Sequence, residues 1–559
     1  MKLRQVQVHN VRSMKDTKFG LEDYCILVGC NNAGKTNLLD AIRLFYEEGI
    51  KYDEKRDIPT FGCDDGDSWI EMTYELPPEE EQSLPDKYRL PQNRLRIRKY
   101  FCRKGGKPGM FAYVGDSLSE DSFFGAKAVQ QGKVGTVTYV PAVDRLEEEA
   151  KLSGPSPFRD LLTAVLDDVV RSGQSFRKLS EDIVGFSSTI KGEENASGKS
   201  LGMLEQQLTE SLSSWGSEFA FKFRTPNAQD IIKSLLDYAL TDPTTGLPMN
   251  PSQFGDGMQR HLLYSLIALA GEYSTKETEQ GSDEFRPRFS LLIFEEPEAF
   301  LHPQQQDSLA TSLRNLAASA GHQVIISTHS PEFINRSTDT IPSIVHVARS
   351  SGQTVCGQVT EVSWKELCDK NQAANALAAR GCTVPESDVD TLEWIKYFMW
   401  LDASRCRVFL SDSVLLVEGP TERVLIDYMQ RNGLLPQLDG EARAFVMDTG
   451  GKWNMPRFIN LFGQLRVPHS VLFDGDKGKI KADEWAHLIE ASANDSTRLV
   501  RHFETDLEGT LGLGKTSRSN EKPQYVLKAL MEGSIPQDKL DALAELVSGL
   551  LAQSAPREQ

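Results

Sequence analysis

The pattern of apolar and polar positions along the chain predicts an α/β protein. Residues 24–28 form an apolar run that ends at a glycine-containing loop, and residues 37–45 carry apolar side chains at helical spacing. This order predicts a strand, a loop and a helix. Unbroken apolar runs at 290–294 and 323–327 are typical of buried strands in a parallel sheet.

The pattern changes between these strands. Short alternating segments from about 67 to 140 predict a β-meander. Helical spacing begins near Phe158, and a polar, glycine- and serine-bearing stretch at 187–200 predicts an exposed loop that interrupts this helical segment. Because heptads are not sustained across the segment, we do not expect an ATPase with long coiled-coil arms. After a helical connector, strands are predicted again at 414–417, 444–447 and 470–473, in a second α/β region.

Composition limits the class of protein. The 559 residues include 62 Lys or Arg and 80 Asp or Glu, and the net charge of −18 argues against a protein that coats nucleic acid nonspecifically. The sequence has no apolar run of membrane-spanning length and no signal-peptide pattern, so we expect a cytoplasmic protein without membrane contact. The alternating Arg94, Arg96 and Arg98 leave two interpretations open, a solvated strand edge or a phosphate-contacting face.

A glycine-rich loop follows the first apolar strand. The sequence Gly-Cys-Asn-Asn-Ala-Gly-Lys-Thr, ending at Thr36, matches the G-x-x-x-x-G-K-[ST] pattern of a phosphate-binding loop. Backbone N–H groups around Asn31, Asn32 and Gly34 can cradle phosphates, Lys35 can reach the β- and γ-phosphate oxygens, and Thr36 can bind Mg²⁺. We therefore predict an ATP site.

Acidic and histidine residues stand at the ends of the next two buried strands. Glu295 occupies the place where such strands usually carry a Mg²⁺-linked Asp, and Glu296 is placed to polarise the attacking water. His329 follows the strand at 323–327, at the edge where open α/β sheets bind ligands. We expect His329 to sense the γ-phosphate.

The phosphate-loop pattern recurs at 509–516, but its context differs. No apolar run precedes this second match, and the polar segment up to Pro523 does not predict a phosphate-cradling helix. We interpret the match as coincidental. The preceding Asp506-Leu-Glu508 instead offers two carboxylates on one face of an extended segment, as a second metal position would need.

The strands of the second α/β region end in acidic residues. Glu418-Gly-Pro-Thr-Glu422 follows the first strand, Gly450-Gly451 follows the second, and Asp474-Gly-Asp476 follows the third. Carboxylates at the ends of adjacent parallel strands can hold divalent metals through oxygen ligands. The alternative is that these residues only decorate the surface.

The first 350 residues resemble ATP-binding-cassette proteins in the order of their motifs. A degenerate signature at Gly255 and Gly257, the acidic strand, a D-loop-like segment at 298–302 and a switch histidine follow the glycine loop. The resemblance implies that the signature of one subunit completes the nucleotide site of another, so we expect a homodimer or a larger homo-oligomer. Arg12, in an opening strand that resembles the DNA-handling branch, is an additional candidate for nucleotide contact.

The second region resembles a Toprim domain, and nearly the whole chain resembles the OLD (overcoming lysogenization defect) family of ATPase-nucleases. The resemblance implies that one Mg²⁺ or Mn²⁺ is bound by Glu418, Glu422, Asp474 and Asp476, and that a second is completed by Asp506 and Glu508. Lys522 matches a late basic residue that stabilises the pentavalent phosphate. The expected catalytic residues are thus Glu296, Glu418, Asp474 and Lys522.

The expected fold is α/β, with an ABC-type ATPase that contains a helical insertion and is followed by a Rossmann-like Toprim domain. The expected boundaries are 1–155 and 243–365 for the ATPase, 156–242 for a dimerising insertion, 366–410 for the connector and 411–559 for the Toprim domain. The expected function is that of an ATP-regulated, metal-dependent DNA endonuclease, an anti-phage defence effector with a partner protein. The alternatives are a non-nucleolytic DNA-binding ATPase of the SMC/RecF type and a Toprim enzyme of the topoisomerase or primase type.

Overall fold

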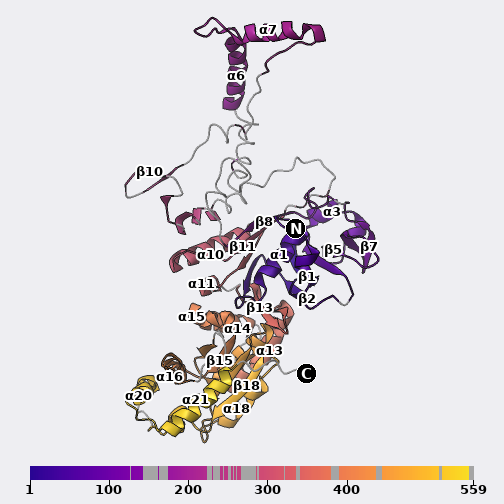
Figure 1. Ribbon diagram of the computed structural model, residues 1–559. Coiled ribbons are helices and arrows are strands. Elements are labelled where there is room, and N and C mark those ends of the chain that lie inside the picture. The colour runs from indigo at the N-terminus through magenta and orange to yellow at the C-terminus, as the bar shows by residue number, and fades with distance from the viewer. Residues whose placement is uncertain are drawn as a thin grey trace. The chain divides into compact units, whose positions relative to one another are not determined.

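The computed structural model describes most of the chain in two compact units. The described residues are 1–63, 65–125, 127–142, 174–222, 289–319, 321–334, 340–378, 389–435, 444–514 and 519–552, with short pieces between 162 and 287. The first unit comprises Met1–Ala142 and Asp283–Gln559, and the second comprises Val143–Ser282. Figure 1 gives the order of the elements along the chain.

An antiparallel sheet forms the N-terminal part of the first unit. Its strands follow the order β2-β1-β4-β5-β6-β7 and are β1 (Lys2–Val11), β2 (Met14–Gly20), β4 (Ser68–Glu75), β5 (Arg94–Cys102), β6 (Gly109–Val114) and β7 (Ser117–Ser122). Alternation places one side-chain set inside, so that Val6, Val8, Leu95 and Ile97 are fully buried. The predicted meander is therefore present in β4 to β7.

A mostly parallel sheet carries the glycine loop. Its order is β14-β13-β3-β12-β11-β8, with β3 (Tyr24–Val28), β8 (Thr136–Val140), β11 (Ser290–Glu295), β12 (His322–Ser327), β13 (Ile344–Ser350) and β14 (Gln353–Gln358). Helix α1 (Lys35–Tyr46) follows β3 and shares one apolar core with both sheets through Leu38, Leu39, Ile42 and Phe45. The predicted strands at 24–28, 290–294 and 323–327 are thus correct.

The meander prediction was wrong for its last strand. β8 pairs in parallel with β11, with Thr136 opposite Ser290, and so belongs to the sheet of the glycine loop. Alternation of apolar residues identifies a strand but not its partner, because the partner lies about 150 residues away in the sequence.

The second unit contains two helices with a loop between them. α6 (Gln174–Gly192) and α7 (Leu201–Leu212) are followed by η2 (Ser213–Trp215) and by the paired β9 (Leu240–Thr241) and β10 (Pro248–Met249). The predicted loop at 187–200 begins later than expected, because α6 continues through Gly192. Asn195 then organises the turn by accepting N–H groups from Ser197 and Lys199.

Helices connect the sheet that carries the glycine loop to the second parallel sheet. They are α13 (Glu361–Ala378), α14 (Val389–Trp400), α15 (Ala403–Cys406) and η5 (Arg407–Leu410). Trp364 stacks on Trp394 at 4.1 Å between ring centroids. The fully buried Glu393 accepts hydrogen bonds from Asn371 at 3.0 Å and from Arg457 at 3.3 Å, which ties the connector to the next domain.

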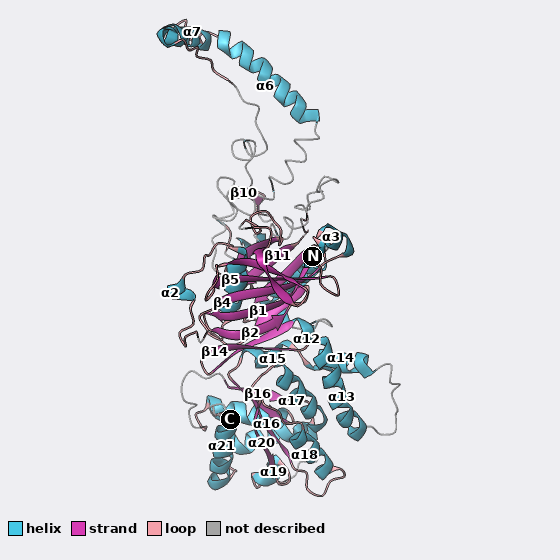
Figure 2. Cartoon of the chain, turned by 90° about the vertical axis from the view of Figure 1, so that its right-hand side faces the viewer, coloured by secondary structure: helices cyan, strands magenta, loops and turns pink. Residues whose placement is uncertain are grey.

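The C-terminal domain is a parallel sheet with helices around it (Figure 2). The strand order is β16-β15-β17-β18, with β15 (Ser413–Val417), β16 (Ala444–Asp448), β17 (His469–Asp474) and β18 (Thr497–Phe503). The larger helices are α16 (Pro420–Arg431), α17 (Met455–Gln464), α18 (Ala482–Ala491), α20 (Lys522–Met531) and α21 (Gln537–Leu551). The strands predicted in this region are present, and β18 was missed.

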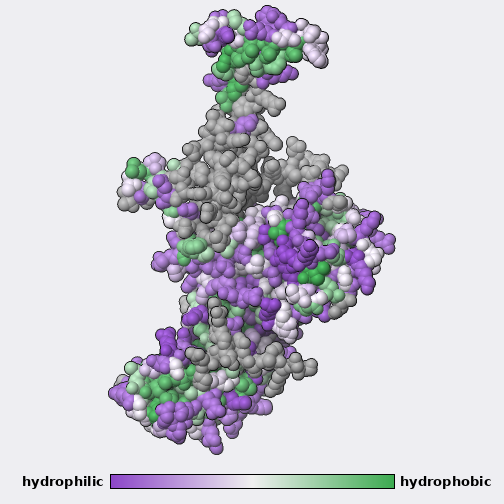
Figure 3. All heavy atoms as spheres, viewed as in Figure 1, coloured by the Kyte–Doolittle hydropathy of each residue, from purple (hydrophilic) through white to green (hydrophobic). Residues whose placement is uncertain are grey.

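The remaining elements are short, apart from α10. They are α2 (Glu54–Asp57), α3 (Pro78–Ser83), η1 (Asp86–Tyr88), α10 (Pro303–Ala318), α11 (Pro331–Ile334), α12 (Thr340–Ser343), η6 (Lys452–Asn454), α19 (Leu507–Thr510) and η7 (Ser519–Glu521). Figure 3 shows that hydrophilic residues dominate the visible face around the N-terminal sheet. Within the described ranges, no helix combines the length and apolar character needed to span a membrane.

Candidate functional site

The glycine loop connects β3 to α1 in a conformation that requires glycine. Gly34 has φ of +110°, and a Cβ atom there would lie 2.1 Å from Thr354 Oγ1. Thr354 donates that hydroxyl to Ala33 O at 3.2 Å, so the loop is held against β14. Asn31 and Asn32 are exposed at its tip. The loop therefore has its backbone fixed and its outer side open.

Lys35 is the buried cation of this loop. Its Nζ donates to Gly29 O at 2.9 Å and to Cys30 O at 3.0 Å. Burial lowers the pKa of Lys35 to about 8, while nearby carboxylates, Glu296 foremost, counteract this shift. An anion bound in the loop would favour the charged ammonium, which is the chemistry expected at a phosphate site.

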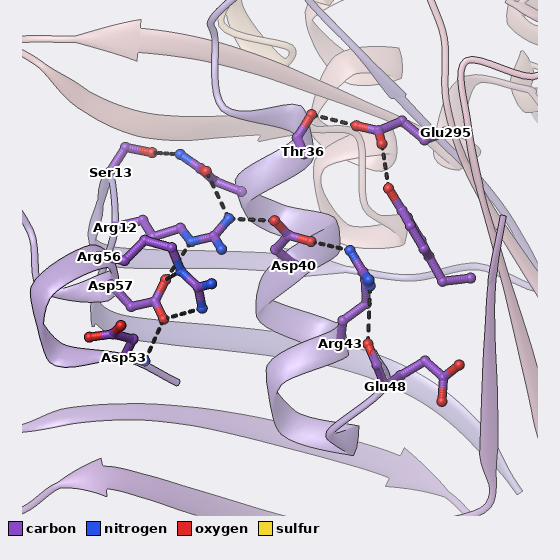
Figure 4. Close-up of polar contacts among 12 residues, drawn as sticks. Arg12, Ser13, Thr36, Asp40, Arg43, Glu48, Asp53, Arg56, Asp57 and Glu295 are labelled. Carbon is purple, nitrogen blue, oxygen red and sulfur yellow. Dashed lines mark hydrogen bonds and ion pairs between the residues drawn. The ribbon is translucent and has the colours of Figure 1, made fainter. Parts of the chain in front are cut away.

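Thr36 and Glu295 meet across the edge of the sheet (Figure 4). The Thr36 hydroxyl donates to Glu295 Oε1 at 2.6 Å. Tyr139, on β8, donates its hydroxyl to Glu295 Oε2 at 2.5 Å, and Arg43 lies 3.6 Å from the centroid of the Tyr139 ring. Both oxygens of Glu295 are thus oriented. Tyr139 was missed from the sequence, because it lies in no motif and its partner strand was assigned wrongly.

Glu296 and His329 form the next pair along the same edge. His329 Nε2 lies 3.4 Å from Glu296 Oε1, and the His329 backbone N–H donates to Glu298 Oε1 at 2.5 Å. Parallel pairing of β11 with β12 places Glu295 opposite Ser327 and so brings both strand ends to one place. The structure therefore gathers Lys35 with the acidic and histidine residues that the sequence predicted for this site.

Arg12 is engaged away from the loop tip. Its guanidinium pairs with Asp40, on α1, and donates to Asp57 Oδ1 at 2.8 Å (Figure 4). The structure thus gives Arg12 a role in holding α1 to the N-terminal sheet. Gly255 and Gly257, the signature residues, belong to the second unit, where the chain is helical from Gly257.

The predicted carboxylates of the second site gather at the carboxyl edge of β15 and β17. Glu418 directly follows β15, Glu422 lies in the first turn of α16, and Asp474 ends β17. Glu422 Oε2 accepts the Gly419 N–H at 3.0 Å, and Asp474 Oδ1 accepts the Leu507 N–H at 3.1 Å. Adjacent parallel strands therefore bring these side chains together, as the sequence predicted.

These carboxylates repel one another in a buried environment. Burial first, and then the charges of Glu422, Glu418, Asp476 and Glu508, raise the pKa of Asp474 to about 8. Burial first, and then the charges of Glu418 and Glu508, raise the pKa of Glu422 to about 7. Glu418 Oε2 is buried and has no hydrogen-bond partner among the described residues. The site thus carries negative charge that its own hydrogen bonds do not fully compensate.

Two lysines hold Asp476, whose backbone φ is +55°. Lys452 Nζ donates to Asp476 Oδ2 at 2.7 Å, and Lys479 Nζ donates to Asp476 Oδ1 at 2.5 Å. Burial opposes the shift, but the hydrogen bonds from both lysines lower the pKa of Asp476. Lys452 was missed from the sequence, although its position directly after Gly450-Gly451 was a signal that could have identified it.

Asp506 and Glu508 lie at the start of the short helix α19, and not on an extended segment as predicted. Asp506 caps the helix by accepting the Gly509 N–H at 2.9 Å. Glu508 Oε1 lies 2.8 Å from Lys522 Nζ, at the start of α20. The prediction of two carboxylates on one strand face was therefore wrong, because a helix cap replaces the strand. The structure nevertheless brings Glu508 and Lys522 to the carboxylate site, since both act electrostatically on Asp474 or its neighbours.

The second phosphate-loop match has no cradle in its described part. β18 ends at Phe503, before α19 intervenes, and a helix begins only at Lys522. Two details of the sequence interpretation were wrong: a strand does precede this region, and Pro523 starts a helix instead of preventing one. Lys515 and Thr516 lie outside the described residues.

The carboxylate set suits a divalent metal ion by its donor chemistry. All its donors are carboxylate oxygens, which hard divalent cations prefer. In the described part of the chain, no three Asp, Glu, His or Cys side chains converge as a ready-made metal site. Three lysines pair with these carboxylates instead: Lys452 and Lys479 engage Asp476, and Lys522 engages Glu508. Glu418 Oε2, which is buried and receives no hydrogen bond from a described residue, still marks a place for a cation.

The arginine row of β5 is satisfied within its own sheet. Arg96 and Arg98 both pair with the buried Glu71, at 2.5 Å and 2.6 Å, and Arg98 also lies 3.7 Å from the centroid of the Trp69 ring. These contacts favour a structural role for these arginines over a phosphate-contacting face.

Two known family models match the chain. Residues 25–335, more than half of the chain, match the model of "AAA domain, putative AbiEii toxin, Type IV TA system". Residues 409–476 match "Overcoming lysogenization defect protein-like, TOPRIM domain". The chain belongs to the OLD family. The predicted family and fold class, an ATPase followed by a Toprim domain, are confirmed.

Relatives of this OLD family member carry nuclease names. It is 24% identical over 496 residues to the "Old nuclease" of Escherichia phage P2, with 85% of this chain and 77% of that one covered. It is 24% identical to the "OLD nuclease" of Thermus scotoductus over the full length of both chains. It is 27% identical over 261 residues to "Endonuclease GajA" of Bacillus cereus, which covers 44% of this chain and 34% of the relative.

Proposed function

We propose that this OLD family protein is an ATP-regulated, divalent-metal-dependent endonuclease that nicks or cuts duplex DNA. The observation that carries the proposal is the set of buried carboxylates at the carboxyl edge of β15 and β17 in a Toprim domain. The nuclease names of the relatives support the same reaction class.

In the ATPase half, different residues would bind the phosphates, bind Mg²⁺ and activate the attacking water. The N–H groups of the glycine loop and Lys35 would hold the phosphates, while Thr36 and Glu295 would bind Mg²⁺. Glu296 would accept a proton from the attacking water, and His329, 3.4 Å from it, would contact the γ-phosphate.

In the Toprim half, two groups of oxygen donors would hold Mg²⁺ or Mn²⁺. The first group comprises Glu418, Glu422, Asp474 and Asp476, and the second comprises Asp506 and Glu508. A bound metal pair would supply a nucleophilic water at neutral pH and neutralise the leaving oxygen. The Lys522 ammonium, already at this site through Glu508, would neutralise charge on the phosphate under attack.

We further propose a homodimer or larger homo-oligomer, acting in anti-phage defence with a partner protein. The signature at Gly255 and Gly257 of one subunit would complete the nucleotide site of another.

The test uses supercoiled plasmid incubated with the full chain and Mg²⁺ or Mn²⁺, with and without ATP. We expect nicked or linear product that requires the metal and disappears in Asp474→Asn. ATP hydrolysis without any strand cleavage would favour a DNA-binding ATPase of the SMC/RecF type, and religated topoisomers would favour a topoisomerase.

A further inference from the structure

Lys452 is a buried ammonium at the centre of the predicted metal ligands. Its side chain is 7% exposed. Its Nζ donates to the backbone O of Asp474 and to Asp476 Oδ2 at 2.7 Å, and it lies 4.0 Å from Glu418 Oε2. The residues around it are thus three of the four proposed for the first metal position.

The turn before Lys452 fixes this placement. Gly450 and Gly451 have φ of +70° and +123°, and Gly451 N donates to Glu418 O at 2.8 Å. Thr449 Oγ1 donates to Val417 O at 3.1 Å, so the turn is tied to the end of β15. Lys452 therefore enters the site from a rigid turn and not from a mobile surface loop.

We propose that Lys452 is the internal counter-ion of this site and that a divalent metal must take over its role. The inference rests on the proposed function. Without metal, the ammonium compensates Asp476 and partly Glu418, which keeps mutually repelling carboxylates in one place. When a metal ion binds, the positive charge of the Lys452 ammonium repels it. Lys452 therefore sets the metal affinity of the site.

Replacing Lys452 should therefore strengthen metal binding, although replacing a residue beside metal ligands usually weakens it. Removing a residue that merely holds the ligands in place would weaken metal binding. Removing the counter-ion instead destabilises the metal-free site and relieves repulsion in the metal-bound site, so metal binding becomes tighter. Charges a few ångströms apart in a protein interior interact strongly enough for a change of about tenfold or more in affinity.

Lys479 provides a matched control. It contacts the other oxygen of the same carboxylate, Asp476 Oδ1, but its side chain is 65% exposed against 7% for Lys452. Solvent screens an exposed pair, so Lys479→Met should change metal affinity by less than about threefold.

The experiment titrates Mn²⁺ into the nucleotide-free full chain by calorimetry and follows thermal melting in EDTA and in Mn²⁺. Asp474→Asn identifies the part of the binding that belongs to this site. We expect Lys452→Met to bind Mn²⁺ about tenfold more tightly, to melt lower in EDTA, and to gain more from Mn²⁺ than the unaltered chain. Lys452→Gln, which keeps a hydrogen-bond donor without the charge, should behave the same and serves if the Met variant does not fold.

Unchanged or weaker Mn²⁺ binding in both Lys452 variants would overturn the inference, even if the unaltered chain cuts DNA and so upholds the proposed function. An unaltered chain that shows neither Asp474-dependent Mn²⁺ binding nor cleavage would overturn the proposed function and the inference together.

Discussion

At the scale of single residues, Glu295 has both of its carboxylate oxygens engaged at the end of β11. Its carboxylate receives the hydroxyls of Thr36 at 2.6 Å and Tyr139 at 2.5 Å, one on each oxygen. A nucleotide-bound Mg²⁺ would draw on the same Thr36 and Glu295 oxygens, so Tyr139 is the contact that can keep Glu295 oriented. Tyr139 is therefore a positioning residue in our interpretation.

Tyr139→Phe should lower ATP turnover by about tenfold and raise the Mg²⁺ concentration needed for half-maximal turnover, because a hydrogen bond to a charged group is lost. Tyr113→Phe is the matched control, since Tyr113 donates its hydroxyl to the buried Glu71 at 2.8 Å, on the N-terminal sheet. The measurement is steady-state ATP hydrolysis across a Mg²⁺ series. Equal Mg²⁺ dependence in the two variants would show that Tyr139 contributes only to stability.

Residues within motifs were predictable, and residues that complete the sites from elsewhere were not. The glycine-loop pattern places Lys35, and the end of an apolar strand places Asp474, whose role as a metal ligand is implied by the family resemblance. Tyr139 reaches Glu295 across a parallel pair whose partners are far apart in sequence. Lys452 was hidden because a lysine after a turn is usually solvated, and its burial depends on how that turn docks on β15.

At the scale of elements, the Gly450-Gly451 turn sets the approach of Lys452. A Cβ atom at Gly450 would lie 2.3 Å from the Trp400 ring, at the end of α14. Gly433, after α16, has a similar φ of +68° against +70° for Gly450, but a Cβ there would meet nothing within 4 Å. An alanine at Gly433 would thus meet backbone strain alone, whereas an alanine at Gly450 would meet the same strain and a steric clash.

Gly450→Ala should destabilise the protein more than Gly433→Ala. The positive φ should lower the free energy of unfolding of both variants by about 1 kcal/mol. The clash with Trp400 should lower that of Gly450→Ala by about 1–3 kcal/mol more. Thermal melting of the two variants in the same buffer gives the comparison. Equal melting temperatures would mean that Trp400 moves aside at no cost, and the turn would then not be rigid.

The element predictions succeeded where burial is complete. β3 is apolar and buried throughout, and β11, β12 and β17 each contain a run of three or four buried apolar residues, so the pattern identified them directly. β18 was missed because Arg498, Arg501 and His502 interrupt its apolar positions, as expected for an edge strand with polar neighbours.

At the scale of the whole molecule, the nucleotide and carboxylate sites lie at the edges of two different sheets. The β13–β14 hairpin connects the two parts by contact. His346, on β13, donates Nδ1–H to Leu465 O at 2.9 Å, and Gly357, on β14, packs so closely on Leu465 that a Cβ there would lie 2.2 Å from its carbonyl oxygen. Thr354 of the same β14 holds the glycine loop at Ala33. The hairpin therefore contacts both the glycine loop and the C-terminal domain.

DNA cleavage and ATP hydrolysis should be separable by substitutions in the two sites. Asp474→Ala removes a metal ligand and should reduce DNA cleavage about a hundredfold or more, because the main electrostatic stabilisation of the transition state is lost. ATP hydrolysis should survive, since the contacts of Asp474 among the described residues are with Leu507 and the carboxylate site. Glu296→Gln should instead affect the ATPase reaction: the variant should still bind ATP but hydrolyse it more slowly. Plasmid nicking, ATP turnover and thermal melting are measured on the same preparations. Loss of ATP turnover in Asp474→Ala at an unchanged melting temperature would contradict independence, and the β13–β14 hairpin would then be the first place to look for obligatory coupling.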